Sequence, residues 1–471
     1  MREALASCDM GAVVSAYRTH PFHGRLITQE VAAGWVGITQ SQLSRIERGD
    51  EITSLPKLRR WAQVLGIPAE LLWFTAASEW PGGARRGNAV SLVGADAGPE
   101  SLEGPDDDPV LSISWGHRGT VEASVALSDG RSRVKRRGFL FLTGAALTAP
   151  AHQWLVREPG PVVSGLSGGR VSAGLADRLP AMITELRRMD DVAGGGTVLS
   201  LAQHHFGWVA GLLDQASYTE PTGLRLHVAL AELGQFAGWA AYDAGHHGLA
   251  QRYYIAALRA AHSADDRQLG AHILRSMAFQ AAHQERPAEA VTLIETAVAG
   301  ARGRETPSLL AELSIAKAMA LATLKDDSAC TAAISHARTH VERLKPDDTP
   351  SYLYWVNPAQ IMVNAGNSLL QLGQADRAAT MLDGVTLFDE SFARDRQIYL
   401  THLADAHARP GPQRDLDLAA GRGMEAIDLA ESLDSPRGVG HLRDLYHQMR
   451  PYAQVPAVGD FVERARGFLA A

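Results

Sequence analysis

Cysteine is nearly absent from this chain of 471 residues, which contains only Cys8 and Cys330. Two cysteines cannot build a disulfide framework, and their scarcity is typical of proteins kept in a reducing compartment. The N-terminus also lacks the succession of basic, apolar and small residues that marks a secretory signal peptide. We therefore expect a cytoplasmic protein, and the Ala-, Gly- and Arg-rich composition favours a bacterial one.

Motifs of common enzymes are also missing. There is no H-E-x-x-H, no P-loop and no C-x-x-C pair, and no two carboxylates stand in a recognisable catalytic pattern. The adjacent pairs His204–His205 and His246–His247 would point about 100° apart on a helix, which is unfavourable for chelating one metal ion. Gly194–Gly196 precedes a predicted helix but follows no strand, so we interpret it as a loop. We expect no enzyme, no catalytic residue, no cofactor and no metal site.

An excess of positive charge is absent as well. The net charge is −7, and residues 1–75 hold eight Lys/Arg against seven Asp/Glu. DNA affinity comes largely from neutralising phosphates, so any DNA-binding surface on such a chain would have to be local, and the affinity of one copy would be modest. The length is sufficient for two or three domains.

Residues 28–49 carry the clearest pattern in the chain. The spacing predicts a helix that buries Ala33 and Val36, a tight turn at Gly37, and a second helix that buries Leu43 and Ile46. Ile38 would fill the space between these helices. We expect Thr39 to cap the second helix and Gly49 to end it.

The other face of the predicted second helix is polar. Gln40, Ser41, Ser44 and Arg45 would form a row of hydrogen-bonding side chains on this face. Such a row suits base edges in a major groove, since Gln pairs with adenine, Arg with guanine and Ser with either.

These 22 residues resemble the helix-turn-helix of phage-repressor-like (XRE-type) bacterial transcriptional regulators. Eleven positions match the family signature in the right order: Thr28, Gln29, Ala33, Gly37, Ile38, Thr39, Leu43, Ser44, Ile46, Glu47 and Gly49. The resemblance implies a DNA-binding site formed by Gln29, on phosphate, and by Thr39, Gln40, Ser41, Ser44 and Arg45. Members commonly bind paired half-sites as homodimers. Ala32 departs from the usual leucine, and Val31 is a candidate to supply the missing volume.

Helical patterns flank this motif and complete a domain over residues 1–75. An opening helix is predicted over 3–19, with Leu5, Val13, Val14 and Tyr17 facing inward, a fourth helix after Ser54, and a short fifth over 69–74. Five helices fit the small all-helical DNA-binding domain that the resemblance implies.

Residues 76–134 change in character. Glycines, prolines and an acidic run over 100–108 predict a flexible linker, within which 121–127 could form an isolated strand. The acidic run is interpreted as solvated linker, with masking of the DNA-binding face as the alternative.

Residues 135–169 are predicted to be an apolar segment and a connector. Residues 135–150 resemble a twin-arginine export signal, but they lie deep in the chain, and the apolar stretch is too short to span a bilayer. We expect an apolar helix that packs on the domain that follows, without stable membrane insertion; transient membrane association is the alternative.

The remainder, residues 170–471, reads as successive helices. One spacing of 12, 4 and 3 residues recurs four times with mostly small residues at its first and second places: Gly238, Ala250, Tyr254 and Ala257; Ala278, Ala290, Ile294 and Ala297; Ala318, Cys330, Ile334 and Ala337; Gly366, Ala378, Leu382 and Val385. Small residues let two antiparallel helices approach closely. The pattern resembles the tetratricopeptide repeat, with longer units than the family norm, and predicts an α-solenoid. A poorer fifth unit is expected near Ala419 and Ala426, and one more pair of helices over 170–235.

Such a stack forms a concave groove that, in the tetratricopeptide family, commonly binds a peptide or protein. Candidate groove residues are Tyr242, Arg275, Lys317 and Asn364. The sequence as a whole predicts an all-α transcriptional regulator. Its N-terminal domain would bind double-stranded DNA, and its repeats would sense a peptide, protein or small-molecule signal or would oligomerise. The alternative is a protein-interaction scaffold that does not bind DNA.

Overall fold

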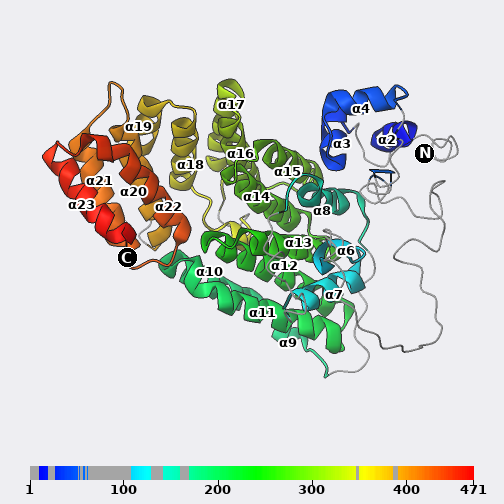
Figure 1. The fold of residues 1–471 in the computed structure, drawn as a ribbon. Helices are drawn as coiled ribbons and strands as arrows, with labels where there is room; N and C mark the ends of the chain where they lie inside the picture. The colour runs from blue at the N-terminus through cyan, green and yellow to red at the C-terminus, as the bar shows by residue number, and fades with distance from the viewer. Residues whose placement is uncertain are drawn as a thin grey trace, which may run out of the picture. The chain divides into compact units, whose positions relative to one another are not determined.

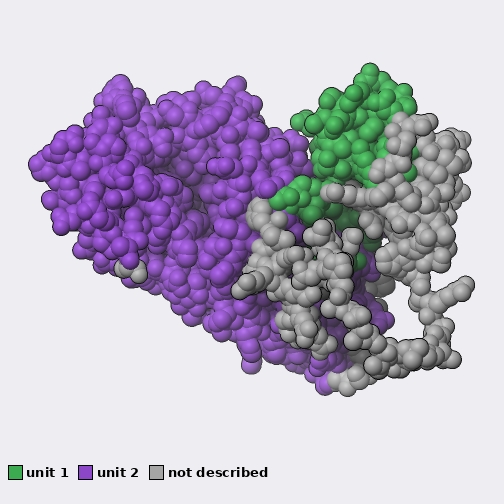
Figure 2. Space-filling view, in the orientation of Figure 1, with its two compact units in different colours: residues 1–112, 143–157 green, residues 113–142, 158–471 purple. Residues whose placement is uncertain are grey.

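The computed structural model describes residues 10–19, 27–50, 52, 57–58, 61, 108–128, 142–159, 169–345, 349–385 and 391–470. Apart from one isolated bridge between Arg170 and Ser217, the regular structure of these residues is helical, which confirms the predicted all-α class (Figure 1). The chain divides into two compact units, residues 1–112 with 143–157, and residues 113–142 with 158–471 (Figure 2).

The first unit contains α2 (Met10–Arg18), α3 (Gln29–Val36), α4 (Gln40–Glu47), α6 (Pro109–Ser112) and α8 (Ala145–Val156). Its core is formed largely by side chains of α2, α3 and α4, together with one tryptophan beyond them: Met10, Val13, Val14, Ile27, Ala32, Ala33, Trp35, Val36, Leu43, Ile46 and Trp61. The inward positions predicted on the first three helices are therefore confirmed wherever they are described. Leu5, Ser54 and residues 69–74 lie outside the described residues.

Helix α8 completes this core. The ring of His152 stacks on Trp35 of α3 with centroids 3.8 Å apart, and its Nε2 lies 3.2 Å from the hydroxyl of Tyr17. Ala149 and Leu155 pack against the same cluster. The prediction that this apolar helix packs on the following domain is therefore wrong: it packs on the one that precedes it, because Trp35 offers a large flat apolar face there. Residues 135–140, which carry the paired arginines, lie outside the described residues.

Part of the predicted linker is helical. Residues 121–127 belong to α7 (His117–Ser128) and not to a strand. Helix α7 buries Val121, Ala123 and Leu127 against α11 and α13 of the second unit. The buried guanidinium of Arg259 on α13 donates to the carbonyls of Ile113 and Ser114 at 2.8 and 2.5 Å and thereby holds the entry to this helix. β-Branched residues favoured a strand in the sequence, and tertiary packing overrides that preference.

The second unit is an array of helical hairpins in which successive helices lie side by side (Figure 1). After α9 (Ala173–Ala176), its helices are α10 (Leu179–Ala193), α11 (Gly195–Gln215), α12 (Glu220–Asp243), α13 (His247–Ser263), α14 (Arg267–His283), α15 (Pro287–Gly300), α16 (Pro307–Thr323), α17 (Asp327–Val341), η6 (Ser351–Leu353), α18 (Pro358–Gln371), α19 (Ala375–Asp383), α20 (Ala393–Ala408), α21 (Leu416–Ala430), α22 (Pro436–Met449), η7 (Arg450–Tyr452) and α23 (Pro456–Ala470).

The repeated small positions lie at the contact between the two helices of each hairpin. All sixteen residues of the recurring spacing are buried except Val385, which is half-buried. A Cβ added to Gly238 would lie 2.6 Å from the ring of Tyr254, and one added to Gly366 would lie 2.6 Å from Leu382. The large third residue therefore fills the space that the small first residue leaves open.

A second repeated feature was not visible in the sequence pattern. The residue seven places after each small first position has a left-handed backbone: Gly245, Glu285, Lys325 and Gly373, with φ between 56° and 80°. Each lies in the turn that joins the two helices of a hairpin. Because glycine occupies only two of these four turns, a search for glycine alone cannot reveal the period.

We expect Gly238→Ala to destabilise the second unit by about 1–3 kcal/mol, since the added methyl overlaps the Tyr254 ring. Urea unfolding followed by circular dichroism measures the change. Gly421→Ala on α21 is the matched control: nothing lies within 4 Å of its Cβ position, so the substitution should stabilise by about 0.5–1 kcal/mol. Equal effects at the two glycines would contradict the packing role.

No helix in the described part of the chain is long and apolar enough to cross a membrane.

Candidate nucleic-acid interface

Local backbone chemistry fixes the turn between α3 and α4. Helix α3 begins at the Thr28 cap, whose hydroxyl accepts from the N–H of Val31 at 3.4 Å. It ends at Gly37, which has a φ of 72°, and the N–H of Ile38 reaches back to the carbonyl of Ala33 at 3.0 Å. This is a Schellman-type ending, and it confirms the predicted glycine turn.

Helix α4 is capped at both ends. The Thr39 hydroxyl accepts from the N–H of Gln42, and the Gln42 side chain accepts from the N–H of Thr39, so the two residues form a capping box. At the other end, Gly49 has a φ of 119°, and the N–H of Asp50 bonds the carbonyl of Arg45. Both predicted end residues are confirmed, and the eight-residue helix has defined limits.

One face of α4 is buried, and this fixes the direction of its opposite, polar face. Leu43 and Ile46 are buried, whereas Gln40, Ser41 and Arg45 are exposed and Ser44 is half-buried. The polar row predicted from the spacing therefore faces away from the core of the unit.

A chain of hydrogen bonds leads from the core to this face. Arg18 of α2 grips the Glu47 carboxylate with two nitrogens, at 2.5 and 2.9 Å. Glu47 accepts from Gln29 at 2.7 Å, and the Oε1 of Gln29 accepts from Nε2 of Gln40 at 2.8 Å. The Glu47 side chain is only 6% exposed, so the pair is poorly screened and holds both glutamines in one orientation.

A match to a known family supports the same assignment. A family model described as Helix-turn-helix matches residues 25–72. This match supports a DNA-binding regulator of the XRE type. No curated protein matches the chain. The tetratricopeptide resemblance is not confirmed by a family match and stays a prediction.

The two arginines at the end of the helix-turn-helix motif differ. Arg45 lies 3.9 Å from Asp50 with both side chains 63% exposed, a contact that contributes little and leaves the guanidinium free to reorient. Arg48 instead donates to the Ser44 carbonyl at 3.0 Å and to its hydroxyl at 3.1 Å. The Ser44 hydroxyl is therefore already engaged, which the sequence did not indicate.

Two further residues of the helix-turn-helix domain were missed as organisers. Trp35 is fully buried at the centre of its core, and Glu47 joins three elements. Glu47 matches the family signature, but the sequence did not predict that its carboxylate joins these elements. Ala32, the departure from the signature, is buried with a relative exposure of 1%, and Val31 packs against the core only in part. The bulk of Trp35 occupies the centre of this core.

Proposed function

We propose that this protein is a sequence-specific transcriptional regulator and not an enzyme, and that α4 enters the major groove of double-stranded DNA. The observation that supports this is the hydrogen-bonded chain from Glu47 to Gln40. It fixes the amide of Gln40 on an exposed helix face, while Leu43 and Ile46 anchor the opposite face. Preorganised donors and acceptors on such a helix are what base recognition requires.

The proposed roles follow from the free atoms of each side chain. One N–H of Gln40 is bonded to Gln29, which leaves its second N–H and its oxygen for the bidentate contact with adenine. The exposed guanidinium of Arg45 suits guanine. Ser41 and Thr39 share a hydrogen bond at 3.1 Å beside this face. Gln29 and Ser44 both form hydrogen bonds within the domain. Gln29 would contact a backbone phosphate, and Ser44 would act as a positioning residue for Arg48.

A homodimer is part of this proposal. Residues 1–75 carry only one more basic than acidic residue, so a single domain gains little from neutralising phosphates. Two copies on paired half-sites double the number of phosphate contacts, and each recognition helix reads its own half-site.

Helix α8 supplies a physical route between the repeats and the DNA-binding domain. Leu142, in the second unit, bonds Gln251 of α13 through both its N–H and its carbonyl, at 2.6 and 3.0 Å. The chain then enters the first unit at Thr143, and α8 follows and stacks His152 on Trp35. A signal that shifts α13 would act on α8 through this connection. Such a signal changes DNA binding only if its affinity differs between the state of the protein that can bind DNA and the state that cannot.

Arg45→Ala tests the base-reading role. We expect a loss of about 1–3 kcal/mol at operators with guanine at one position and little change when that base is replaced, because the bidentate contact carries the discrimination. Fluorescence anisotropy with an operator and its single-base variants measures this. Arg188→Ala, an exposed arginine of α10, is the control. An equal loss on every sequence would make Arg45 a phosphate contact.

A protein-interaction scaffold is the second candidate, and the low charge of residues 1–75 favours it. The two functions differ in the salt dependence of DNA binding. A regulator that neutralises phosphates shows log K falling linearly with log salt concentration, whereas a scaffold shows no specific DNA binding at any salt concentration.

A further inference from the structure

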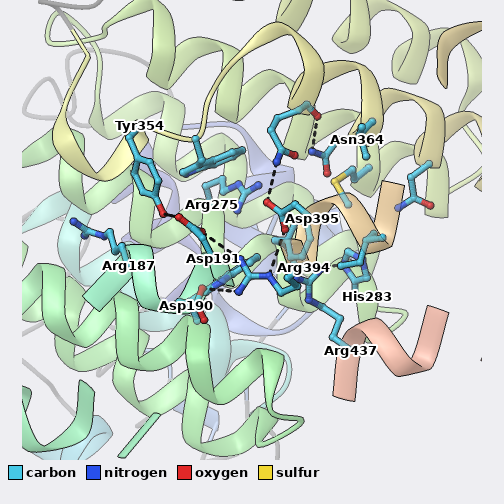
Figure 3. A pocket seen from close by; sticks show the side chains of 18 of the residues that line it. Arg187, Asp190, Asp191, Arg275, His283, Tyr354, Asn364, Arg394, Asp395 and Arg437 are labelled. Carbon is cyan, nitrogen blue, oxygen red and sulfur yellow. Dashed lines mark hydrogen bonds and ion pairs between the residues drawn. The ribbon is translucent and has the colours of Figure 1, made fainter. Parts of the chain in front are cut away.

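A cavity of about 110 Å³ lies within the second unit (Figure 3). One water molecule needs only about 10–15 Å³ of such space, so the cavity has room for a small organic molecule. The first helices of successive hairpins, α12, α14, α16, α18, α20 and α22, supply most of its wall, together with α10 and the segment around η6. Their partner helices α13, α15, α17, α19 and α21 supply none. The predicted groove on the first helices is therefore present as a cavity.

Only part of the expected groove lines this cavity. Arg275 and Asn364 face it, as predicted. Tyr242 is buried behind the wall, with its ring 5.9 Å from Phe279, and Lys317 pairs with Glu295 at 3.9 Å away from the lining.

On one side of the cavity, the charged side chains form ion pairs with one another. Arg394 lies among three lining carboxylates: its nitrogens are 2.5 Å from Asp190, 3.3 Å from Asp395 and 3.8 Å from Asp191. Asp191 also accepts from the hydroxyl of Tyr354 at 2.5 Å. Burial raises the pKa of Asp191 to about 7, so its negative charge is incomplete at neutral pH. Each of these carboxylates is paired with Arg394, although Oδ1 of Asp190 has no hydrogen-bond partner among the described residues.

Arg275, by contrast, has an unoccupied fork. It is buried with its guanidinium stacked between Phe279 and Trp355, at 4.8 and 4.9 Å from the ring centroids. Its Nε lies 3.4 Å from Glu312, whose carboxylate is shared with His272 at 2.8 Å. Arg275 forms no hydrogen bond with any described residue. Because Glu312 faces Nε, the two Nη atoms are left for a ligand, and a planar oxyanion matches the fork that they form.

A second arginine and three histidines surround the same end of the cavity. Arg437 directs Nε to Asp243 at 2.8 Å, while its Nη2 has no hydrogen-bond partner among the described residues. Burial, helped by the charge of Arg437, lowers the pKa of His283 to about 4 and that of His402 to about 3. His441 behaves in the same way. These imidazoles are neutral at pH 7. His283 already donates its one N–H to the carbonyl of Phe279 at 2.9 Å, so His402 and His441 are the two that can donate an N–H without adding charge that must be balanced.

Aromatic rings form the rest of this end. Besides Phe279 and Trp355, Trp239 lines the cavity between its two sides: Arg437 lies 5.3 Å and Arg394 5.7 Å from the centroid of its ring. Flat apolar surfaces beside a charged fork complement a planar molecule that carries one oxyanion at its edge.

We propose that this cavity binds a small aromatic organic anion, a carboxylate or phosphate, whose oxygens occupy the fork of Arg275 and whose ring lies against Trp239 and Trp355. The proposal deepens the sensing role of the repeats and rests on the proposed function only for its effect on DNA. Ligand binding itself is measured without DNA, so its failure leaves the helix-turn-helix assignment intact.

The test compares matched probes on the full-length wild-type protein. We expect 2-naphthoate and 2-naphthyl phosphate to raise the Tm and quench tryptophan fluorescence, with saturation at millimolar concentration or below. The neutral 2-naphthamide and the cationic 2-naphthylmethylamine should do neither. The comparison of acid with amide requires no variant, so a misfolded mutant cannot confound it. Failure of both anions to bind, or amide or amine binding as tight as the acid, would overturn the proposal.

Variants then locate the site. Arg275→Gln should weaken 2-naphthoate binding by at least tenfold, and Arg275→Lys, which keeps the charge but loses the fork, should weaken it less. Lys317→Gln, a basic residue on the neighbouring helix α16 that does not line the cavity, should leave it unchanged. An unchanged affinity in Arg275→Gln, or binding of inorganic phosphate as tight as that of 2-naphthyl phosphate, would contradict the assigned contacts.

Discussion

Replacing Arg394 with methionine is expected to destabilise the second unit by about 3–5 kcal/mol, because it removes one partner of a buried ion-pair network. Arg394 is 3% exposed and joins α20 to Asp190 on α10, 204 positions earlier in the chain. Asp243 of α12 lies 4.0 Å from the same guanidinium. Without the arginine, several buried carboxylates would repel one another across these three helices.

The pH dependence identifies this cause. The charge of Arg394 lowers the pKa values of Asp190 and Asp191, which burial raises, so its removal raises both further. A carboxyl whose folded pKa lies above its unfolded value binds more protons when folded, and its contribution to stability is lost as pH rises between the two values. The deficit of Arg394→Met should therefore be smaller at pH 5 than at pH 8. Urea unfolding at both pH values measures it.

Arg188→Met is the control for this substitution. Arg188 lies on α10 beside the network, but its side chain is 68% exposed and pairs only with Glu185. An exposed pair of this kind is worth about 0–1 kcal/mol. A deficit in Arg394→Met as small as in Arg188→Met would show that the network does not hold α10 to α20.

Trp35→Ala is expected to destabilise the helix-turn-helix unit by about 3–5 kcal/mol, the usual cost of truncating a buried tryptophan. Trp35 is fully buried between the core of α3 and α4 and the ring of His152 on α8. Its loss removes the surface on which α8 stacks. We expect amides of α3 and α4 to lose hydrogen-exchange protection and specific DNA binding to weaken with them.

Trp208→Ala provides the comparison. Trp208 lies on α11 in the second unit and is 38% exposed, so its truncation should leave exchange in α3 and α4 unchanged. Unaltered protection of α3 and α4 in Trp35→Ala would contradict the central position of this ring.

The recognition motif was predictable because its constraints are local. Thr39, Gly37 and Gly49 act on backbone groups within a few residues, so their roles follow from sequence spacing alone. The small positions of the repeats were predictable for the same reason: Gly238 and Tyr254 lie on consecutive helices and meet directly.

Features that depend on distant parts of the chain were not predictable. Helix α8 stacks His152 on Trp35, more than a hundred residues away, and the ion pair of Arg394 with Asp190 spans 204 positions. The cavity is likewise assembled from eight separate segments, and the spacing of Arg275 in the sequence says nothing about which rings enclose it. A periodic pattern identifies the helices and their inner faces, but not the side chains that converge from different repeats.

The most direct measurement of the regulator assignment is genome-wide recovery of DNA bound by the wild-type protein and by the Gln40→Ala/Arg45→Ala double variant. Both side chains are exposed, so the double variant should fold normally. We expect short, often palindromic sites that disappear in the variant. If both proteins recover the same sparse background, the DNA-binding assignment is contradicted, and the scaffold function takes its place.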